Sequence, residues 1–457
     1  MRPMLICLAL TVSLCSVLVA APVGWRGNGT GKYLDATPPT EWAADKNVVW
    51  STPLPSRSNS TPVIVGDRII FCAEPTLVMC ASASTGQILW QSSCAFEDLA
   101  PDQADKMKAD NARAGQLRGD IGKLWRTAND LKKQVQDKPE DQGLKDQLAA
   151  AQQKAQDLTK ELEPLTKTWY AMPGTHPENG NTSYTPVSDG HHVWVMFNTG
   201  LVACYGLDGK RIWWKVVEKL FHDWGGCCSP VLVGNKLIVH PTKMFALDKD
   251  TGEQIWQQDL QWGWGTPAVA SIGGTDVIIT AKGAFVRAED GKVLARVPVD
   301  LTYDGPVIEG GVVYYIQNGG KAVKLPAAVE NDQLNVQVLW DTAPRNDRYY
   351  SSPIIHEGII YDITQAAVFS AIDAETGKVI YEQTLDLHKG TCYPSVTFAG
   401  GLLFVSSDSG TTAIVKPGRE YQQVAMNTLE NFRASPVFVG NRMYVRGFGK
   451  LWCIDTE

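Results

Sequence analysis

Hydrophobic and polar positions along the chain follow two different periods. Over most of its length, short apolar runs rich in Val, Ile and Leu alternate with turns that contain Gly, Asn or Asp, as in 229–256. Such runs, bounded by turn residues, are typical of short β-strands. Within 97–168, by contrast, Leu and Ala recur at alternating steps of three and four residues, which indicates amphipathic helices. The sequence therefore predicts many short strands and one helical segment.

The strand pattern repeats along the chain. Each copy opens with a proline followed by an apolar or small-residue run, and these prolines are Pro62, Pro186, Pro230, Pro267, Pro306, Pro353, Pro394 and Pro436. From Pro186 onward, successive copies start 37 to 47 residues apart. A repeat of about 40 residues that forms four short strands is the sequence signature of a β-propeller blade. We therefore predict an all-β fold, an eight-bladed β-propeller.

The two ends of the chain are predicted to meet in one blade. The last repeat stops at Asp455 and lacks a final strand, whereas an unassigned strand pattern, 47–50, precedes the first repeat. Pairing this N-terminal strand with the last blade would close the ring and leave no open sheet edge.

The helical segment is predicted to be an inserted antiparallel coiled-coil hairpin, residues 97–168. Two apolar stripes flank a break at 137–140 that contains Pro139. The stripes consist of Leu117, Ile121, Leu124, Ala128, Leu131 and Val135, and of Leu144, Leu148, Ala151, Ala155, Leu158, Leu162 and Leu165. At 1.5 Å per residue, the arms would project roughly 40 to 50 Å. The hairpin is either a spacer or an element for docking and oligomerisation.

The start of the chain predicts export. Residues 1–21 combine Arg2, an apolar stretch and a small-residue ending at Ala20 and Ala21, which is typical of a cleaved signal peptide. Because no second apolar stretch follows, we expect a periplasmic or secreted protein without a transmembrane span. The predicted division is 1–21 signal peptide; 22–96 leader, closing strand and first blade; 97–168 hairpin; and 169–457 blades two to eight.

Composition narrows the classes of partner. The formal net charge of −7 and the pI near 5.6 give no electrostatic footprint for nucleic acid, which we exclude as a primary partner. Eight cysteines remain after the signal peptide. Three of them, Cys80, Cys204 and Cys453, occupy a repeat position that alanine fills elsewhere, so we expect buried core residues. Cys72 and Cys80 flank a predicted turn symmetrically, and a disulfide between them would be compatible with export.

A second motif closes the best-preserved repeat. Ala246, Asp248, Thr251, Gly252 and Trp256 form the pattern Ala-x-Asp-x-x-Thr-Gly-x-x-x-Trp, and related versions occur in other copies. Physically, Thr-Gly makes a tight turn with positive φ, and the indole is large enough to fill the gap between adjacent sheets.

With this motif the chain resembles the PQQ-like, quinoprotein alcohol dehydrogenase-like propellers, whose blades are joined by tryptophan docking. The leader 24–29 is similar to the Arg-Gly-rich leaders of exported bacterial members whose activity is unassigned. The resemblance implies the fold far more strongly than any activity.

Candidate site residues lie in the segments just before the opening strands. In a propeller these segments gather around one mouth of the central channel, where ligands usually bind. The candidates are Arg57, Asn59, His176, Tyr184, His222, Asp223, Trp224, Cys227, Cys228, Trp262, Trp264, Tyr303, Asp304, Arg345, Arg348, Tyr350, His388, Tyr393 and Arg433. Aromatic and arginine side chains of this kind dominate binding energy at interfaces.

Cys227 and Cys228 raise the question of a quinone cofactor. Adjacent cysteines can form only a strained, reducible disulfide ring. The resemblance to PQQ-dependent alcohol dehydrogenases implies such a ring on one face of the quinone, with Trp262 or Trp264 on the other. We identify no counterpart of that family's calcium ligands or catalytic aspartate.

Other catalytic classes lack their motifs. Candidate metal ligands such as His176, His222, His388 and Asp304 come from separate repeats, and no hydrolase motif is present. Our leading hypothesis is thus an exported, non-catalytic binding or scaffold protein with a protein or glycan partner at the mouth and arm and no cofactor. The alternatives are a PQQ- and calcium-dependent oxidoreductase, or a scaffold whose mouth stays empty.

Overall fold

The computed structural model describes residues 22–456, apart from 221, 223, 318–319 and 343–346. The predicted signal peptide and the candidate residues Asp223 and Arg345 therefore lie outside the described residues. None of the described helices is both long and apolar enough to span a membrane.

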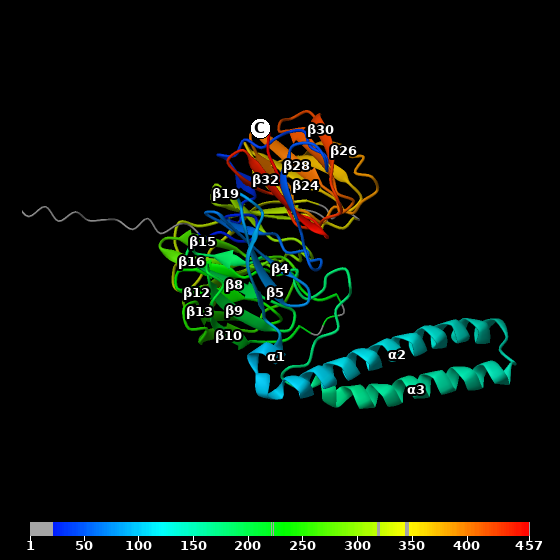
Figure 1. Ribbon diagram of the computed structural model, residues 1–457. Coiled ribbons are helices and arrows are strands. Elements are labelled where there is room, and N and C mark those ends of the chain that lie inside the picture. The colour runs from blue at the N-terminus through cyan, green and yellow to red at the C-terminus, as the bar shows by residue number, and fades with distance from the viewer. Residues whose placement is uncertain (1–21, 221, 223, 318–319, 343–346, 457) are drawn as a thin grey trace, which may run out of the picture.

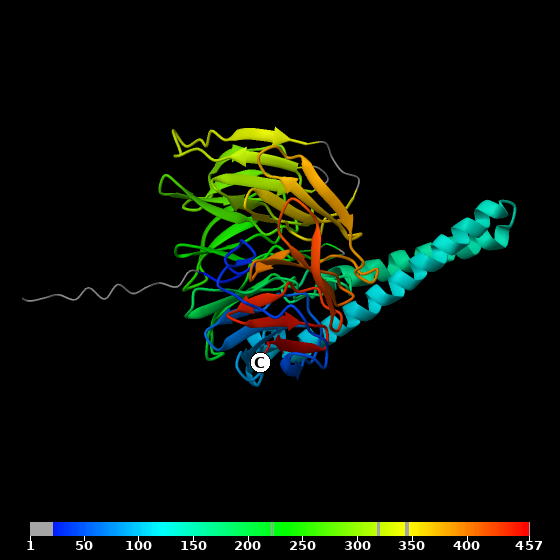
Figure 2. The same cartoon turned by 90° about the horizontal axis from the view of Figure 1, so that it is seen from above.

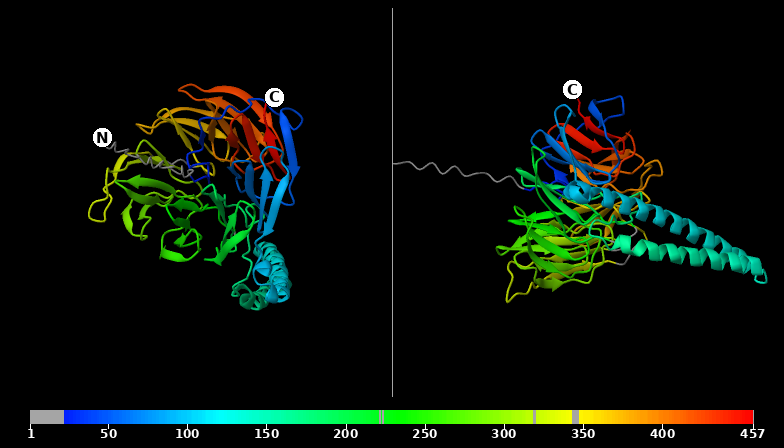
Figure 3. Two further views of the ribbon diagram at one scale, coloured as in Figure 1. Left: turned by 60° about the vertical axis from the view of Figure 1, so that its left-hand side comes forward. Right: turned by 60° about the horizontal axis from the view of Figure 1, so that its bottom comes forward.

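The prediction of an all-β fold with eight blades is confirmed. Eight sheets of at least four strands are arranged around a central axis (Figure 3). Blades one to four consist of β3 (Val63–Val65), β4 (Arg68–Ala73), β5 (Leu77–Ser82) and β6 (Ile88–Ser93); β7 (Val187–Ser188), β8 (His192–Met196), β9 (Leu201–Gly206) and β10 (Arg211–Val216); β11 (Val231–Val233), β12 (Lys236–Val239), β13 (Met244–Asp248) and β14 (Gln254–Gln258); and β15 (Ala268–Ile272), β16 (Thr275–Ile279), β17 (Ala284–Arg287) and β18 (Val293–Arg296).

Blades five to seven repeat this order, and the last blade combines strands from both ends of the chain. They consist of β19 (Val307–Glu309), β20 (Val312–Ile316), β21 (Gly320–Lys324) and β22 (Gln337–Asp341); β23 (Ile354–His356), β24 (Ile359–Ile363), β25 (Val368–Asp373) and β26 (Val379–Thr384); β27 (Thr397–Ala399), β28 (Leu402–Ser406), β29 (Thr411–Lys416) and β30 (Gln422–Thr428); and β31 (Val437–Val439), β32 (Arg442–Arg446), β33 (Lys450–Ile454) and β2 (Val48–Pro53).

The N-terminal strand β2 is the outer strand of blade eight. It runs antiparallel to β33, with Trp50 opposite Cys453. A short strand that the sequence did not suggest, β1 (Lys32–Tyr33), adds to blade seven by pairing parallel with β27.

The hydrophobic core lies between neighbouring blades rather than within one centre. Each pair of neighbours shares an apolar cluster; Ile279 of blade four and Tyr315 of blade five, for example, are both almost completely buried in one of them. Phe71 of blade one and Tyr444 of blade eight share the cluster that joins the first blade to the last. Burial of these faces is the main favourable term holding the ring together.

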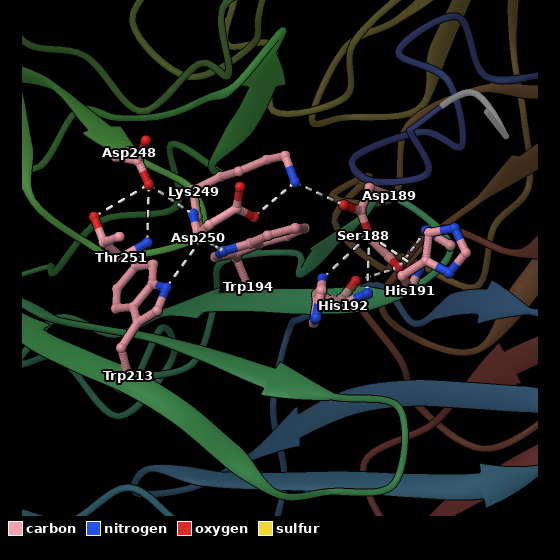
Figure 4. A network of polar contacts seen from close by, with 11 residues as sticks. Ser188, Asp189, His191, His192, Trp194, Trp213, Asp248, Lys249, Asp250 and Thr251 are labelled. Carbon is pink, nitrogen blue, oxygen red and sulfur yellow. Dashed lines mark hydrogen bonds and ion pairs between the residues drawn. The ribbon is translucent and has the colours of Figure 1, made fainter.

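Each docked tryptophan connects its own blade to the next one. In Figure 4, Trp213 of β10 lies against the turn of blade three, and its Nε1 donates to the carbonyl oxygen of Lys249 at 2.9 Å. Asp248 Oδ1 accepts from the backbone N–H of Thr251 at 2.9 Å and so fixes the turn. Gly252 has φ +74°, and a Cβ there would meet the Trp213 ring at 2.6 Å. The same contact pairs Trp50 with Gly86, Trp90 with Gly209, Trp256 with Gly291 and Trp340 with Gly377.

The helical insertion is a long hairpin that projects from the ring (Figures 1 and 2). After α1 (Phe96–Leu99) and a 3-10 turn, η1 (Pro101–Gln103), it consists of α2 (Ala104–Asp137) and α3 (Gln142–Thr166). The 34 residues of α2 correspond to about 50 Å. Asp141 caps α3 by accepting from the backbone N–H of Leu144.

The predicted apolar stripes of the hairpin are buried or half-buried along its whole length. Ala128 and Ala155, from the two stripes, are almost fully buried. At the base, Met107 and Tyr170 join the core cluster between blades one and two. The helices therefore cover each other's apolar faces, and only the base is anchored in the propeller.

Cys72 and Cys80 are not opposite each other, so that expectation is wrong. In the β4–β5 hairpin, Cys72 pairs with Val78 and Cys80 with Ile70, because the turn is centred one residue earlier than assumed. Both are buried free thiols.

Candidate ligand-binding site at the channel mouth

Hydroxyl groups join the blades at the start of their inner strands. The residue before each opening proline is Ser or Thr in six of the blades, and several of these hydroxyls accept a backbone N–H from the preceding blade. The links run from Thr185 N to Ser229 Oγ (3.0 Å), Ser229 N to Thr266 Oγ1 (3.0 Å), Gly305 N to Ser352 Oγ (3.2 Å), Ser352 N to Ser395 Oγ (3.1 Å), Ser395 N to Ser435 Oγ (2.9 Å) and Ser435 N to Thr61 Oγ1 (3.1 Å). This collar fixes the radius of the channel.

A cavity of about 430 Å³ lies above the collar. Pockets of this size hold small ligands or one protruding group of a larger partner. The structure brings nine of the sequence-predicted residues together in its wall: Asn59, Trp224, Cys227, Trp264, Tyr303, Arg348, Tyr350, Tyr393 and Arg433.

The aromatic residues of the mouth form a continuous arc. Successive ring centroids lie 5.6 Å apart from Trp264 to Tyr303, 4.7 Å from Tyr303 to Tyr350 and 4.7 Å from Tyr350 to Tyr393. The Arg433 guanidinium lies 4.0 Å from the centre of the Tyr393 ring, within cation–π range. These flat, amphipathic faces are suited to stacking against a planar group, an aliphatic side chain or a sugar ring.

Most charged groups of the wall already have partners. The Arg433 guanidinium pairs with the carboxylates of Glu178 and, at 3.1 Å, Asp408. Arg57 lies 3.8 Å from the same Glu178 carboxylate. Arg348 is exposed beside the tyrosines, 3.5 Å from Tyr350 Oη. Apart from Arg348, the described wall is therefore nearly neutral.

The leader crosses the channel below the cavity. Its backbone bridges to blade two, where Val23 N and Ser188 O are 2.9 Å apart, and Arg26 Nη2 donates to Val396 O at 3.1 Å. Trp25 lines both the mouth cavity and a second hollow of about 450 Å³ deeper in the channel. Trp25 therefore lies between the two hollows and forms part of the floor of the mouth cavity.

Other predicted residues lie around the cavity but not in its wall. His176 stacks on Trp224 with centroids 4.0 Å apart, and His222 contacts Trp262 and Trp264 on the outer rim. Arg57 lies over the ring of Phe448.

Four predicted residues point away from the mouth. Tyr184 is buried and donates to Asn198 Oδ1 at 2.7 Å. His388 Nδ1 lies 3.0 Å from Thr411 Oγ1 within blade seven. Cys228 and Asp304 are buried behind the wall.

Asp304 belongs to a buried polar layer instead of the ligand site. Among the described residues, neither of its carboxylate oxygens has a hydrogen-bond partner. Burial, followed by the charge of Asp362, raises the pKa of Asp304 well above its usual value, whereas Arg26 and Lys282 oppose this shift.

Cys227 and Cys228 are free thiols. Cys227 Sγ lies 3.5 Å from Trp264 O, and Cys228 is fully buried. Burial raises the pKa of Cys227 to about 12 and that of Cys228 further, so neither thiolate forms readily at neutral pH.

We therefore expect the folded protein to resist thiol modification. In a dithiobis-nitrobenzoate assay at neutral pH, native protein should react at least about tenfold more slowly than urea-unfolded protein, because the thiolate is the reactive form. The variant Cys227→Ser should leave this slow native rate nearly unchanged. A fast native reaction that Cys227→Ser removes would contradict the burial described here.

The residues of the mouth do not fit a calcium-bound quinone. Calcium requires several oxygen ligands. The wall carboxylate of Glu178 is bound by arginines, and Asp304 is buried behind the wall. Within the described ranges, no cluster of three or more His, Cys, Asp or Glu side chains could hold a metal ion.

The sequence alone did not identify the collar or the floor. Most collar residues are the Ser or Thr before an opening proline, but the repeat pattern does not show that their hydroxyls join neighbouring blades. Trp25 stands in the leader, which the sequence linked only to a family resemblance. Glu178 and Ser183 also line the cavity, although the sequence did not single them out.

Comparison with known proteins supports the fold. Residues 242–457 match a family model described as outer membrane protein assembly factor BamB. The structure is similar to BamB from Moraxella catarrhalis (12% identity, 90% of this chain and 99% of that chain covered, TM-score 0.57). It is also similar to a europium-containing methanol dehydrogenase (12% identity, 92% of this chain and 88% of that chain covered, TM-score 0.54). A further similar structure is quinohemoprotein alcohol dehydrogenase from Comamonas testosteroni (10% identity, 89% of this chain and 76% of that chain covered, TM-score 0.52). A search among curated proteins gives no significant match. The resemblance to PQQ-like repeat propellers is confirmed, whereas these low identities carry the fold alone.

Proposed function

We propose that this PQQ-like repeat propeller is an exported, non-catalytic binding protein that holds a partner protein at its channel mouth, with the helical arm as a second contact. The observation that carries the proposal is the aromatic arc from Trp264 to Tyr393 around a cavity of about 430 Å³. A cavity of this size, with Trp25 in its floor, can take one protruding group of a partner. No cofactor is part of this proposal.

The side chains of the cavity wall favour a partner that packs against aromatic rings over one that is recognised by its charge. Preformed aromatic faces lose little conformational entropy when they bind, and the neutralised charges around Glu178 offer hydrogen bonds without strong selectivity for one charge. A protein partner that inserts one aromatic or aliphatic side chain fits this wall. A glycan would stack its sugar rings on the same aromatic residues. The test must therefore distinguish a protein partner from a glycan.

The arm extends the reach of the protein beyond the mouth. The apolar stripes of α2 and α3 are buried against each other. The arm therefore does not need a third helix, from a partner, to cover them. Its free end lies far from the ring (Figure 2). We propose that the arm contacts the same partner or a second copy of the chain at this distance.

Mouth variants test the proposal. The double variant Trp264→Ala and Tyr350→Ala should weaken partner binding at least about thirtyfold, since central aromatic anchors are often worth 2 kcal/mol or more. Co-purification from the native source, followed by titration of the identified partner, measures the change. Leu339→Ala, which removes an exposed apolar side chain on β22, is the control and should bind like the wild type.

Three results would contradict the proposal. The first is partner binding that the mouth variants leave unchanged. The second is an oligosaccharide recovered in place of a protein. The third is a quinone: if purified protein mixed with PQQ and calcium retained quinone absorbance after gel filtration and oxidised alcohols with a dye acceptor, the oxidoreductase alternative would hold.

A further inference from the structure

A second groove adjoins the mouth cavity and runs between α2 of the arm and blade two; His176 and His222 line it on the side of the mouth. Its volume is about 1350 Å³. Arg118 and Arg126 line it from α2, Trp169 from the segment after α3, and Val216, Val217 and Lys219 from the outer edge of blade two. Two separate elements of the fold therefore form its walls.

The groove is basic although the whole chain is acidic. Within the described ranges, no carboxylate lies within 4.0 Å of the charged atoms of Arg118, Arg126 or Lys219, whereas the chain carries a net charge of −7. The acid of the groove, Glu218, is occupied by the hydroxyl of Thr242 and by the backbone N–H of Lys243. Glu218 keeps its negative charge, so three cations without a carboxylate partner face one carboxylate and the groove remains net positive.

Two of these cations are held partly out of water. Lys219 Nζ donates to Thr168 O at 2.7 Å and lies 5.6 Å from the centre of the Phe96 ring. Burial lowers the pKa of Lys219 to about 8 and also lowers that of Arg118. A cation in such a place is costly unless an anion approaches it.

The surface beside the cations is suited to an extended chain. β10 is the outermost strand of blade two, and among the described strands it pairs with β9 alone, so its outer edge offers backbone hydrogen-bonding groups. Val216 and Val217, at the end of this strand, and the Trp169 ring, which is 40% exposed, supply apolar contacts. A sulfated or phosphorylated polymer would leave both features unused.

From these observations we propose that the groove binds an acidic, extended segment of a partner polypeptide. Arg118 and Arg126 are two helical turns apart on one face of α2, about 12 Å along the axis. An extended peptide covers this distance in about four residues, so acidic side chains three to four residues apart would reach both arginines. The inference goes beyond the mouth proposal, because none of the aromatic arc is involved.

Binding of a fluorescent oligoglutamate peptide to the full mature protein tests the inference by anisotropy. Wild type should bind oligoglutamate more tightly at low than at physiological ionic strength, and should not bind oligoglutamine. The double variant Arg118→Gln and Lys219→Gln should weaken binding at least about tenfold, because each cation supplies a charge-assisted hydrogen bond. Arg126→Gln, whose side chain is exposed and whose loss cannot unfold the base, should weaken it at least about threefold.

Lys133→Gln is the matched control, since it removes one exposed cation from the distal part of α2, and it should change the affinity less than twofold. The mouth variant Tyr350→Ala, whose ring contacts no residue of the groove, should bind oligoglutamate like the wild type, which separates failure of this inference from failure of the mouth proposal. The inference is overturned if wild type does not bind oligoglutamate, if the groove variants bind as well as Lys133→Gln, or if only dextran sulfate binds in a groove-dependent manner.

Discussion

Replacing Gly252 by alanine is expected to lower the free energy of unfolding by about 2 to 4 kcal/mol, because the substitution adds backbone strain and a collision. Gly252 has φ +74°, which L-residues rarely adopt, and its new Cβ would meet the Trp213 ring at 2.6 Å. The ring cannot retreat without giving up its hydrogen bond to Lys249 O. Denaturant unfolding followed by tryptophan fluorescence measures the loss.

Gly234→Ala separates the two causes. Gly234 also has a positive φ, +59°, but a Cβ there meets nothing within 4 Å. We therefore expect this control to cost only about 1 kcal/mol. Equal losses for the two variants would show that tryptophan docking contributes little, and the description of the blade interfaces would need revision.

Acidification is expected to destabilise the fold by about 3 kcal/mol through one residue, His240. Burial lowers the pKa of His240 from 6.5 to about 4, and the nearby Glu218 carboxylate and a backbone hydrogen bond with Leu260 only partly oppose this. As the pH falls, the unfolded chain binds a proton at this histidine before the folded chain does. The free energy of unfolding therefore decreases as the pH falls from 6.5 to about 4. Each pKa unit between the unfolded and the folded value contributes about 1.4 kcal/mol.

His240→Gln tests this assignment, because glutamine does not titrate. Stability should be measured by denaturant unfolding at several pH values, and the difference between the two proteins cancels the contributions of all other groups. The wild type should lose about 3 kcal/mol more than the variant over this interval. Parallel pH profiles for the two proteins would show that His240 is accessible to protons in the folded state.

The sequence allowed the blades to be counted because each one repeats the same apolar runs and turns. The degenerate repeats can also be explained. Each docking contact joins the tryptophan of one blade to the glycine of the next, so loss of the tryptophan removes the need for that glycine. Blade four keeps Gly291, which receives Trp256, but has Ala295 at the tryptophan position. Blade five correspondingly lacks the glycine turn, and its Leu334 packs on Leu294 instead.

The candidate site was harder to predict, because periodicity places a loop at the mouth but not the direction of its side chains. Trp264 and Tyr350 point into the cavity, whereas Tyr184 and Asp304 are turned into the wall. The floor formed by Trp25 depends on where the leader crosses the channel. The groove beside the arm depends on the angle at which the hairpin leaves the ring, which no local pattern specifies.

Site-specific photo-crosslinking in the native source tests the central claim most directly. A benzophenone amino acid would replace Tyr350 at the mouth or, as a control, Leu89, whose side chain is 47% exposed on β6. The account predicts one discrete protein adduct from position 350 and none from position 89, with the adduct lost when Trp264→Ala is added. Adducts from position 89 alone, or an adduct at position 350 that survives Trp264→Ala, would contradict binding at the mouth.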